Sequence, residues 1–344
     1  MNILQLVRAN ILALKPYSSA RNEYCGDASI FLDANESPNN APYNRYPDPL
    51  QIELKEKIAR LKGVDKSNIL LGNGSDEPID LLIRAFCEPG IDNIVAIDPS
   101  YGMYEVAANI NNVMYRKVLL NDDFDIESAK ILAATDRHTK LIFLCSPNNP
   151  TGNSLNEEEI FKVLDAFEGI VVVDEAYIDF SEKNGFLSLL ANYENLVVLQ
   201  TFSKAWASAG VRLGMAFASE QLISILNKIK YPYNINALTQ EYAMKITDFE
   251  GVVLQWVDET RAERKRISEE LATMKGVKRI YPSDANFLLI RVDDANDVYE
   301  KLVNEGVIVR NRNNVSLCSG CLRITIGSKP ENDVLLDTLK DILG

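Results

Sequence analysis

Histidine is almost absent from this chain of 344 residues, in which His138 is the single example. It lies in the polar segment ATDRHTK ahead of an apolar run, which is typical of a surface position. Mechanisms that use histidine as a general base therefore find little support, as do zinc sites built on several histidines. Any chemistry must come from other side chains.

Cysteine pairs are also scarce. The five cysteines are an odd number and are scattered along the chain. Cys318 and Cys321 form a C-x-x-C motif, but no second pair accompanies it, which disfavours a zinc site. This usage favours a reduced, cytoplasmic protein without a metal.

Positive charge is in deficit. The chain has 36 lysines and arginines against 49 acidic residues, for a net charge of −13. Nucleic acid or an anionic membrane would be repelled over most of such a surface, so neither is expected as a partner. A bound phosphate must be met locally, by a few arginines and backbone N–H groups.

No apolar run approaches the roughly 20 residues that a membrane-spanning helix needs. The N-terminal stretch MNILQLVRANILALKP is interrupted by Arg8 and lacks a small-residue cleavage site, so it does not resemble a signal peptide. Leu4, Val7, Ile11 and Leu14 recur at helical spacing, which predicts an amphipathic helix that ends before Pro16.

Short apolar runs alternate with helical patterns through the middle of the chain. The runs occupy residues 68–72, 93–98, 140–145, 170–174, 195–200 and 213–218. Such alternation predicts a mostly parallel sheet that helices cover on both faces. After residue 230 a long polar helical stretch, short strands and a last helix from about Glu331 predict a smaller α+β domain.

The predicted fold is therefore α/β with two domains. A large domain spans residues 31–230, and a small domain combines residues 1–30 and 231–344, with the N-terminal segment closing over the site. In open α/β sheets the site lies beyond the carboxyl ends of the strands, so the residues that follow each apolar run are the candidates.

Polar residues follow nearly every run. A Gly-containing turn and a helix start come first, where free N–H groups can bind an anion, although no P-loop lysine is present. Asp174 ends a fully apolar run, where an unpaired carboxylate is costly, so a cationic partner is expected. The other candidates are Ser75 and Asp76 in the turn, Tyr101, Asn149 in the loop SPNNPTGN, Tyr177, Thr201, Ser203, Lys204 and Arg212.

Pyridoxal phosphate is one ligand that would use this whole set. Its aldehyde needs a lysine, and its ring nitrogen needs an acid that keeps it protonated. Its phenolate oxygen accepts hydrogen bonds from an amide and a phenol. Its phosphate needs a helix N-terminus, hydroxyls and an arginine.

The motifs SPNNPTG, VVDEAY and SKAWASAGVRLG, in this order, resemble those of the fold-type-I pyridoxal-phosphate-dependent aminotransferases of the class II subgroup. The resemblance implies that Lys204 binds the cofactor aldehyde as a Schiff base and that Asp174 pairs with the ring nitrogen. It further implies that Asn149 and Tyr177 hold the phenolate oxygen and that Tyr101 stacks on the ring. The phosphate would lie among the backbone of Ser75 and Asp76 and the side chains of Thr201, Ser203 and Arg212.

Further motifs resemble the histidinol-phosphate aminotransferases within that superfamily: LDANESP, NRYPDP, YPYNI and CLRITIGSKPEN. The implied reaction is transamination between L-histidinol phosphate and 2-oxoglutarate, giving imidazole acetol phosphate and L-glutamate in histidine biosynthesis. Tyr17, Asn35, Arg310 and Arg323 would bind substrate. Tyr46 would reach the cofactor phosphate of the neighbouring subunit of a homodimer. Ser37 replaces the second asparagine of the family's usual NEN.

Two other functions stay open at this point. An aromatic amino-acid aminotransferase or a threonine-phosphate decarboxylase of the same superfamily would share most of these residues. A pyridoxal-phosphate-binding regulator is the other alternative, but it would need a DNA-binding domain for which this acidic chain leaves no room.

Overall fold

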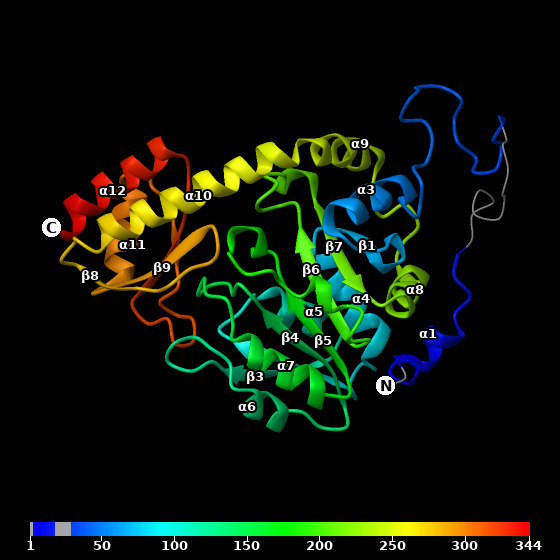
Figure 1. Cartoon of the computed structure of the whole chain (residues 1–344), viewed down its shortest axis with the longest axis horizontal. Coiled ribbons are helices and arrows are strands. Elements are labelled where there is room, and N and C mark those ends of the chain that lie inside the picture. The colour runs from blue at the N-terminus through cyan, green and yellow to red at the C-terminus, as the bar shows by residue number, and fades with distance from the viewer. Residues whose placement is uncertain (1–2, 18–28) are drawn as a thin grey trace.

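The computed structural model describes residues 3–17 and 29–344 (Figure 1). Its centre is a sheet in the order β1-β7-β6-β5-β4-β2-β3, in which β7 alone runs against the other strands. The strands are β1 (Ile69–Asn73), β2 (Asn93–Asp98), β3 (Met114–Leu119), β4 (Thr139–Cys145), β5 (Ile170–Asp174), β6 (Leu196–Thr201) and β7 (Leu213–Ala218). The mostly parallel sheet that the sequence predicts is thus confirmed.

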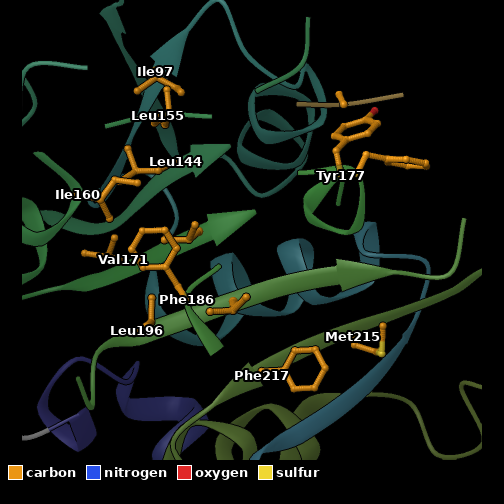
Figure 2. Packing of buried hydrophobic residues seen from close by; sticks show 14 of the residues in the cluster. Ile97, Leu144, Leu155, Ile160, Val171, Tyr177, Phe186, Leu196, Met215 and Phe217 are labelled. Carbon is orange, nitrogen blue, oxygen red and sulfur yellow. The ribbon is translucent and has the colours of Figure 1, made fainter. Parts of the chain in front are cut away.

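Helices cover both faces of this sheet, because its central strands are apolar on both sides. Every residue of β5 is buried, as expected for an IVVV run. One face packs against α4 (Asp76–Phe86), α5 (Met103–Ile110) and α8 (Glu220–Ile229). The other packs against α3 (Ile52–Lys62), α6 (Ser128–Ala133), α7 (Glu157–Ala166) and α9 (Ala237–Ile246). In Figure 2, Leu144 of β4, Val171 of β5 and Ile160 of α7 belong to the second of these layers.

A smaller antiparallel sheet carries its own core. Its order is β10-β11-β9-β8, and its strands are β8 (Val277–Ile280), β9 (Phe287–Val292), β10 (Arg310–Asn311) and β11 (Cys321–Thr325). Apolar residues of the sheet pack with α11 (Ala295–Asn304) and α12 (Lys329–Leu343) in a separate cluster. The long α10 (Glu250–Leu271) runs from the large domain to this one (Figure 1). Short 3-10 turns occur at Ile3–Gln5, Lys66–Asn68, Ile178–Phe180, Leu187–Leu189, Ala209–Val211 and Thr247–Phe249.

Two strands lie outside the apolar runs of the sequence. The edge strand β3 is largely exposed, and β8 has exposed lysine and arginine at its centre. Both strands are too polar to give a continuous apolar signal, since an edge strand needs only one covered side.

The N-terminal segment differs from its expected place beside the small domain. It forms a 3-10 turn and the short α1 (Ala9–Ala13), and Ile3 and Val7 pack into the large-domain core. Arg8 fixes this position through an ion pair to Glu88 at 3.0 Å. Residues 1–2 and 18–28, part of the segment expected to close over the site, lie outside the described residues. No helix in the described ranges is both long and apolar enough to cross a membrane.

Candidate active site

A pocket opens at the carboxyl edge of the large sheet. Three neighbouring parallel strands end there at Cys145, Asp174 and Thr201, and α4 begins beside them at Asp76. The lining residues are Ser75, Asp76, Tyr101, Cys145, Asn149, Asp174, Ala176, Tyr177, Thr201, Ser203, Lys204 and Arg212. All the large-domain candidates from the strand ends therefore meet in one place, as parallel topology requires.

Asp174 is fully buried at the floor of this pocket, and burial raises the pKa of its carboxyl. Oδ2 accepts a hydrogen bond from the Tyr104 phenol at 2.6 Å, and Oδ1 accepts one from the Ala176 N–H at 3.1 Å. No ion pair of Asp174 is found among the described residues, but the Lys204 charge opposes the effect of burial on the pKa of this carboxyl. Two hydrogen bonds to the ionised form partly offset the cost of burial.

Lys204 points into the pocket without a fixed partner. Its Nζ lies 5.3 Å from the Tyr177 ring centroid, and it makes no hydrogen bond or ion pair with the residues that the structure describes. Burial lowers the pKa of this ammonium, and the Arg323 and Arg212 charges lower it further, against the opposing Asp174. Arg323 has a larger effect than Arg212, the only cation that the sequence placed near this lysine. A lysine in such surroundings is poised to act as a neutral amine.

The turn before α4 forms an anion cradle. The Gly74 N–H donates to the Arg212 carbonyl at 2.8 Å, which ties the turn to the segment that carries Lys204. Arg212 adopts left-handed backbone angles (φ 58°, ψ 47°), an unusual conformation that often marks a functional site. Its guanidinium reaches Asp76 at 3.3 Å, so cation and helix start face the same space. The Thr201 hydroxyl donates to the Ser203 hydroxyl at 3.0 Å on the opposite side.

Asn149, Tyr177 and Arg323 close the wall towards the small domain. The Asn149 amide donates to the Tyr177 hydroxyl at 3.5 Å, and Arg323 Nη1 donates to Asn149 Oδ1 at 2.5 Å. The guanidinium of Arg323 also lies 5.1 Å from the Phe287 ring centroid. A residue of β11 thus contacts the loop after β4, which brings a small-domain cation to the large-domain pocket.

Five expected site residues are not among those that line this pocket. Arg323 reaches it only through its contact with Asn149. Tyr17 is 70% exposed and lies in a separate hollow beside residues 227–232. Asn35 and Tyr46 line another hollow, where Tyr46 stacks on Tyr233 with centroids 4.5 Å apart. Arg310 is exposed on the small sheet, paired in register with Arg323.

Tyr104 is the contact that strand-end reasoning misses. It comes from α5, three residues after Tyr101, and its ring stacks on Phe143 with centroids 4.8 Å apart. Tyr101 lies just before α5 and its ring contacts that of Tyr104 at 5.6 Å between centroids, and a buried carboxylate needs a donor. These two signals together point to Tyr104, although neither does so alone. Cys145 also lines the pocket without having been singled out.

The geometry suits a flat ligand that combines an anion, a basic ring nitrogen and a carbonyl group. The α4 turn with Arg212 could hold the anion, and Asp174 could pair with a protonated ring nitrogen. Lys204 could condense with the carbonyl, because its burial and cationic neighbours favour the neutral amine. The residues present therefore fit pyridoxal phosphate in each of its parts.

Comparison with known proteins agrees with this geometry. The model of the family "Aminotransferase class I and II" matches residues 20–339. A histidinol-phosphate aminotransferase of Parabacteroides distasonis is 59% identical over 99% of both chains. The crystal structure of the histidinol-phosphate aminotransferase of Clostridium acetobutylicum has a TM-score of 0.81 at 26% identity, over 87% of this chain and 91% of that one.

The same enzyme of Sinorhizobium meliloti, solved in complex with pyridoxal-5′-phosphate, shares the fold with a TM-score of 0.80. Its identity is 23%, over 90% of this chain and 89% of that chain. These matches extend over both domains, and the family match alone covers most of the chain. The chain belongs to the class I and II aminotransferases.

Proposed function

We propose that this aminotransferase exchanges the amino group between L-histidinol phosphate and 2-oxoglutarate, with pyridoxal phosphate as its cofactor. The products are imidazole acetol phosphate and L-glutamate, a step of histidine biosynthesis. The observation that carries the proposal is the position of Lys204, half-buried at the pocket, where the charges of Arg323, Asp174 and Arg212 act on it. The name of the 59% identical relative supports the same reaction.

The residues of the pocket would hold the cofactor by its parts. The backbone N–H groups of Ser75 and Asp76 with the side chains of Thr201, Ser203 and Arg212 would hold the phosphate. Asn149 and Tyr177 would donate to the phenolate oxygen, and Tyr101 would cover the ring. Pyridoxal phosphate, when bound, supplies an electron sink for the pair left when the substrate Cα loses its proton.

Lys204 would carry the proton. Its Nζ needs to be uncharged to take the proton from the substrate Cα, and the lowered pKa of this amine favours the uncharged form. After taking the proton, Nζ can return it to another carbon within its reach.

Asp174 would hold a proton on the ring nitrogen. Burial raises the pKa of its carboxyl, but a cationic N–H beside it has the opposite effect and favours the carboxylate. The hydrogen bonds from Tyr104 and Ala176 fix both oxygens for this contact. An acid in this place keeps the ring nitrogen charged, which strengthens its electron-withdrawing effect.

Arg323 and Arg310 would bind the substrate anion. Arg323 lies against Asn149 at the pocket wall, and Arg310 is its cross-strand neighbour. The same guanidiniums could receive the phosphate of one substrate and the distal carboxylate of the other, because arginine pairs with both anions in bidentate fashion.

We further propose a homodimer in which Tyr46 reaches the cofactor phosphate of the partner subunit. Tyr46 is 51% exposed and lies outside the pocket of its own chain. Tyr17 and Asn35 are proposed to contact substrate after the N-terminal segment moves. A cytoplasmic location is consistent with free thiols at Cys87, Cys145, Cys318 and Cys321.

A steady-state assay with both substrates tests the proposal. Wild-type enzyme should release L-glutamate from L-histidinol phosphate and 2-oxoglutarate, and Arg323→Ala should raise KM for the phosphorylated amine far more than the cofactor Kd. Release of carbon dioxide from threonine phosphate instead would select the decarboxylase, and turnover of phenylalanine alone would select the aromatic aminotransferase.

A further inference from the structure

Three arginines, Arg310, Arg312 and Arg323, lie together on one face of the small sheet beside the pocket. Strands β10 and β11 are antiparallel with Arg310 opposite Arg323, and the Arg312 N–H donates to the Cys321 carbonyl at 2.9 Å. Directly opposed residues share a face of a sheet, as do residues two apart in one strand. Arg310, Arg312 and Arg323 therefore project from the same face.

None of these guanidiniums forms an ion pair with a carboxylate within residues 3–17 and 29–344. The Nε atoms of Arg312 and Arg323 are buried and make no hydrogen bond there. Within the described part of the chain, eight arginines outside the cluster do pair with carboxylates: Arg266, for example, meets Glu263 at 2.7 Å and Asp333 at 2.8 Å. In a chain with 49 acidic residues, three neighbouring arginines without one acid are an unusual feature.

The cluster is electrostatically costly without a ligand. Burial lowers the pKa of the Arg312 guanidinium to about 10, and the adjacent Arg323 and Arg310 charges contribute to the same shift. Unpaired buried charge and mutual repulsion both favour uptake of an anion. Three cations suit a dianion better than a single carboxylate.

The cluster also adjoins the cofactor pocket. Arg323 donates to Asn149 Oδ1, and both Arg323 and Arg312 oppose the burial effect on the pKa of the Tyr177 phenol. Tyr177 lines the pocket itself. An anion held by the cluster would thus lie close to Asn149 and Tyr177 of the pocket wall.

We propose that Arg312 is a third guanidinium of the substrate-phosphate subsite and determines the preference for a phosphorylated amine. This inference rests on the proposed function, in which Arg310 and Arg323 already bind the substrate anion. Arg312 adds the charge that distinguishes a phosphate dianion from a carboxylate or an uncharged side chain. It acts on binding rather than on proton transfer, because Lys204 carries that step.

Inorganic phosphate provides a direct probe of the subsite. Arg312→Gln should weaken competitive inhibition by phosphate and raise KM for L-histidinol phosphate by about tenfold or more, the usual loss for a charge-assisted hydrogen bond. The single-turnover rate with phenylalanine should change less than about twofold, because that amine has no phosphate for Arg312 to bind. Arg312→Lys should give values of KM and of phosphate inhibition between those of wild type and Arg312→Gln, since it keeps the charge but loses bidentate geometry.

Arg279→Gln is the matched control. Arg279 lies on the same sheet but pairs with Asp123 at 3.1 Å, so its loss changes net charge equally without touching the cluster. Equal inhibition by phosphate in wild type and Arg312→Gln would overturn the inference. An equal loss of activity with phenylalanine in Arg312→Gln would also overturn it. So would a lower unfolding temperature in both Arg312 variants together with the same loss of activity for every amine.

The two claims fail separately. Wild-type enzyme that processes phenylalanine but not L-histidinol phosphate would refute the proposed function. Phosphate inhibition of phenylalanine turnover would then still report on Arg312: loss of inhibition in Arg312→Gln would support an anion subsite, and unchanged inhibition would refute it.

Discussion

At the scale of single residues, Asp174 shows how hydrogen bonds can stabilise a buried carboxylate while it still faces the pocket. A carboxylate at the end of an apolar strand is stabilised by the Tyr104 phenol and the Ala176 N–H, and it is left facing the pocket. Lys204 is the corresponding basic group. Its lowered pKa favours the neutral amine, which is the form that can react. The two pKa shifts have one common cause, burial, and both favour the neutral group.

Tyr104→Phe tests how much Asp174 depends on its phenol partner. Loss of a hydrogen bond to the ionised carboxyl should raise the pKa on the acidic side of the pH–rate profile by roughly one unit and lower kcat about tenfold. The pH at which the visible spectrum of the bound cofactor changes should shift in the same direction. Tyr115→Phe, which removes a phenol from β3 away from Asp174, should leave both profiles unchanged. Identical profiles for wild type and Tyr104→Phe would refute the role.

Glu175 predicts a pH dependence of stability that is independent of catalysis. This carboxyl faces away from the pocket, where it accepts hydrogen bonds from the Phe186 N–H at 2.5 Å and from Gln200 Nε2 at 2.9 Å. Burial raises its pKa to about 7 from the ordinary 4.5. The folded state therefore binds a proton that the unfolded state has lost, so the contribution is present below pH 4.5 and disappears as pH rises through 7.

Glu175→Gln should remove that dependence. Between about pH 5 and about pH 8 the wild type should lose about 2 kcal/mol of unfolding free energy relative to the variant, as measured by urea denaturation. The amide introduced by this substitution would also offer a donor to the buried Gln200 Oε1, which has no hydrogen-bond partner among the described residues. Parallel stability curves for the two proteins would contradict the assigned pKa.

At the scale of elements, the close approach of β7 to the α4 turn sets the anion cradle. A Cβ on Gly214 would overlap the Gly74 carbonyl carbon and the Ser75 nitrogen. Backbone atoms cannot move aside as a flexible side chain can. The absence of a side chain at Gly214 therefore lets the helix start sit against the strand that follows Arg212.

Gly214→Ala should displace the turn. Cofactor affinity should fall at least about tenfold and stability by roughly 1–3 kcal/mol, the usual cost of overpacking. Gly210→Ala is the control in the same segment, because a Cβ there meets nothing within 4 Å. Cofactor titration and thermal unfolding of both variants measure the difference. A Gly214→Ala protein that binds cofactor like wild type would show that the turn tolerates the shift.

The sequence predicts these elements unevenly, for physical reasons. Apolar strands alternate with helices, so the strand ends and the polar residues that follow them can be predicted from the sequence alone. The edge strands β3 and β8 escape this reasoning because polar residues dominate them. The Tyr104–Asp174 and Arg323–Asn149 contacts join residues 70 and 174 positions apart, and no local pattern records such pairs. The N-terminal segment was expected on the small domain because periodicity gives a helix but not its packing partner.

At the scale of the whole molecule, an acidic chain concentrates cations where anions must bind. Net charge is −13, yet Arg212 lines the pocket, and Arg310, Arg312 and Arg323 lie together on the small sheet, where Arg323 contacts the pocket residue Asn149. Such a contrast favours the binding of small anions at the arginines over the rest of the surface. Of the residues expected to contact the cofactor phosphate, Tyr46 alone lies outside the pocket of its own chain. This position agrees with the proposed dimer.

Mixing of subunits tests whether Tyr46 acts across a dimer. Tyr46→Phe subunits keep Lys204, and Lys204→Ala subunits keep Tyr46, so a hybrid would rebuild one complete site. Activity per Lys204 should rise on mixing, towards the wild-type value, at subsaturating cofactor. Activity per Lys204 that stays constant as hybrids form would show that each subunit uses only its own residues.

The central claim is that the Lys204–Asp174 pocket works on a phosphorylated amine, and single-turnover spectroscopy of the cofactor-loaded enzyme tests it most directly. Loss of the visible absorbance of the bound cofactor should be at least about tenfold more efficient with L-histidinol phosphate than with phenylalanine, as expected for a charge-assisted anion contact. Lys204→Ala should abolish the change. Equal efficiency for the two amines, or an unchanged spectrum with L-histidinol phosphate, would contradict the account.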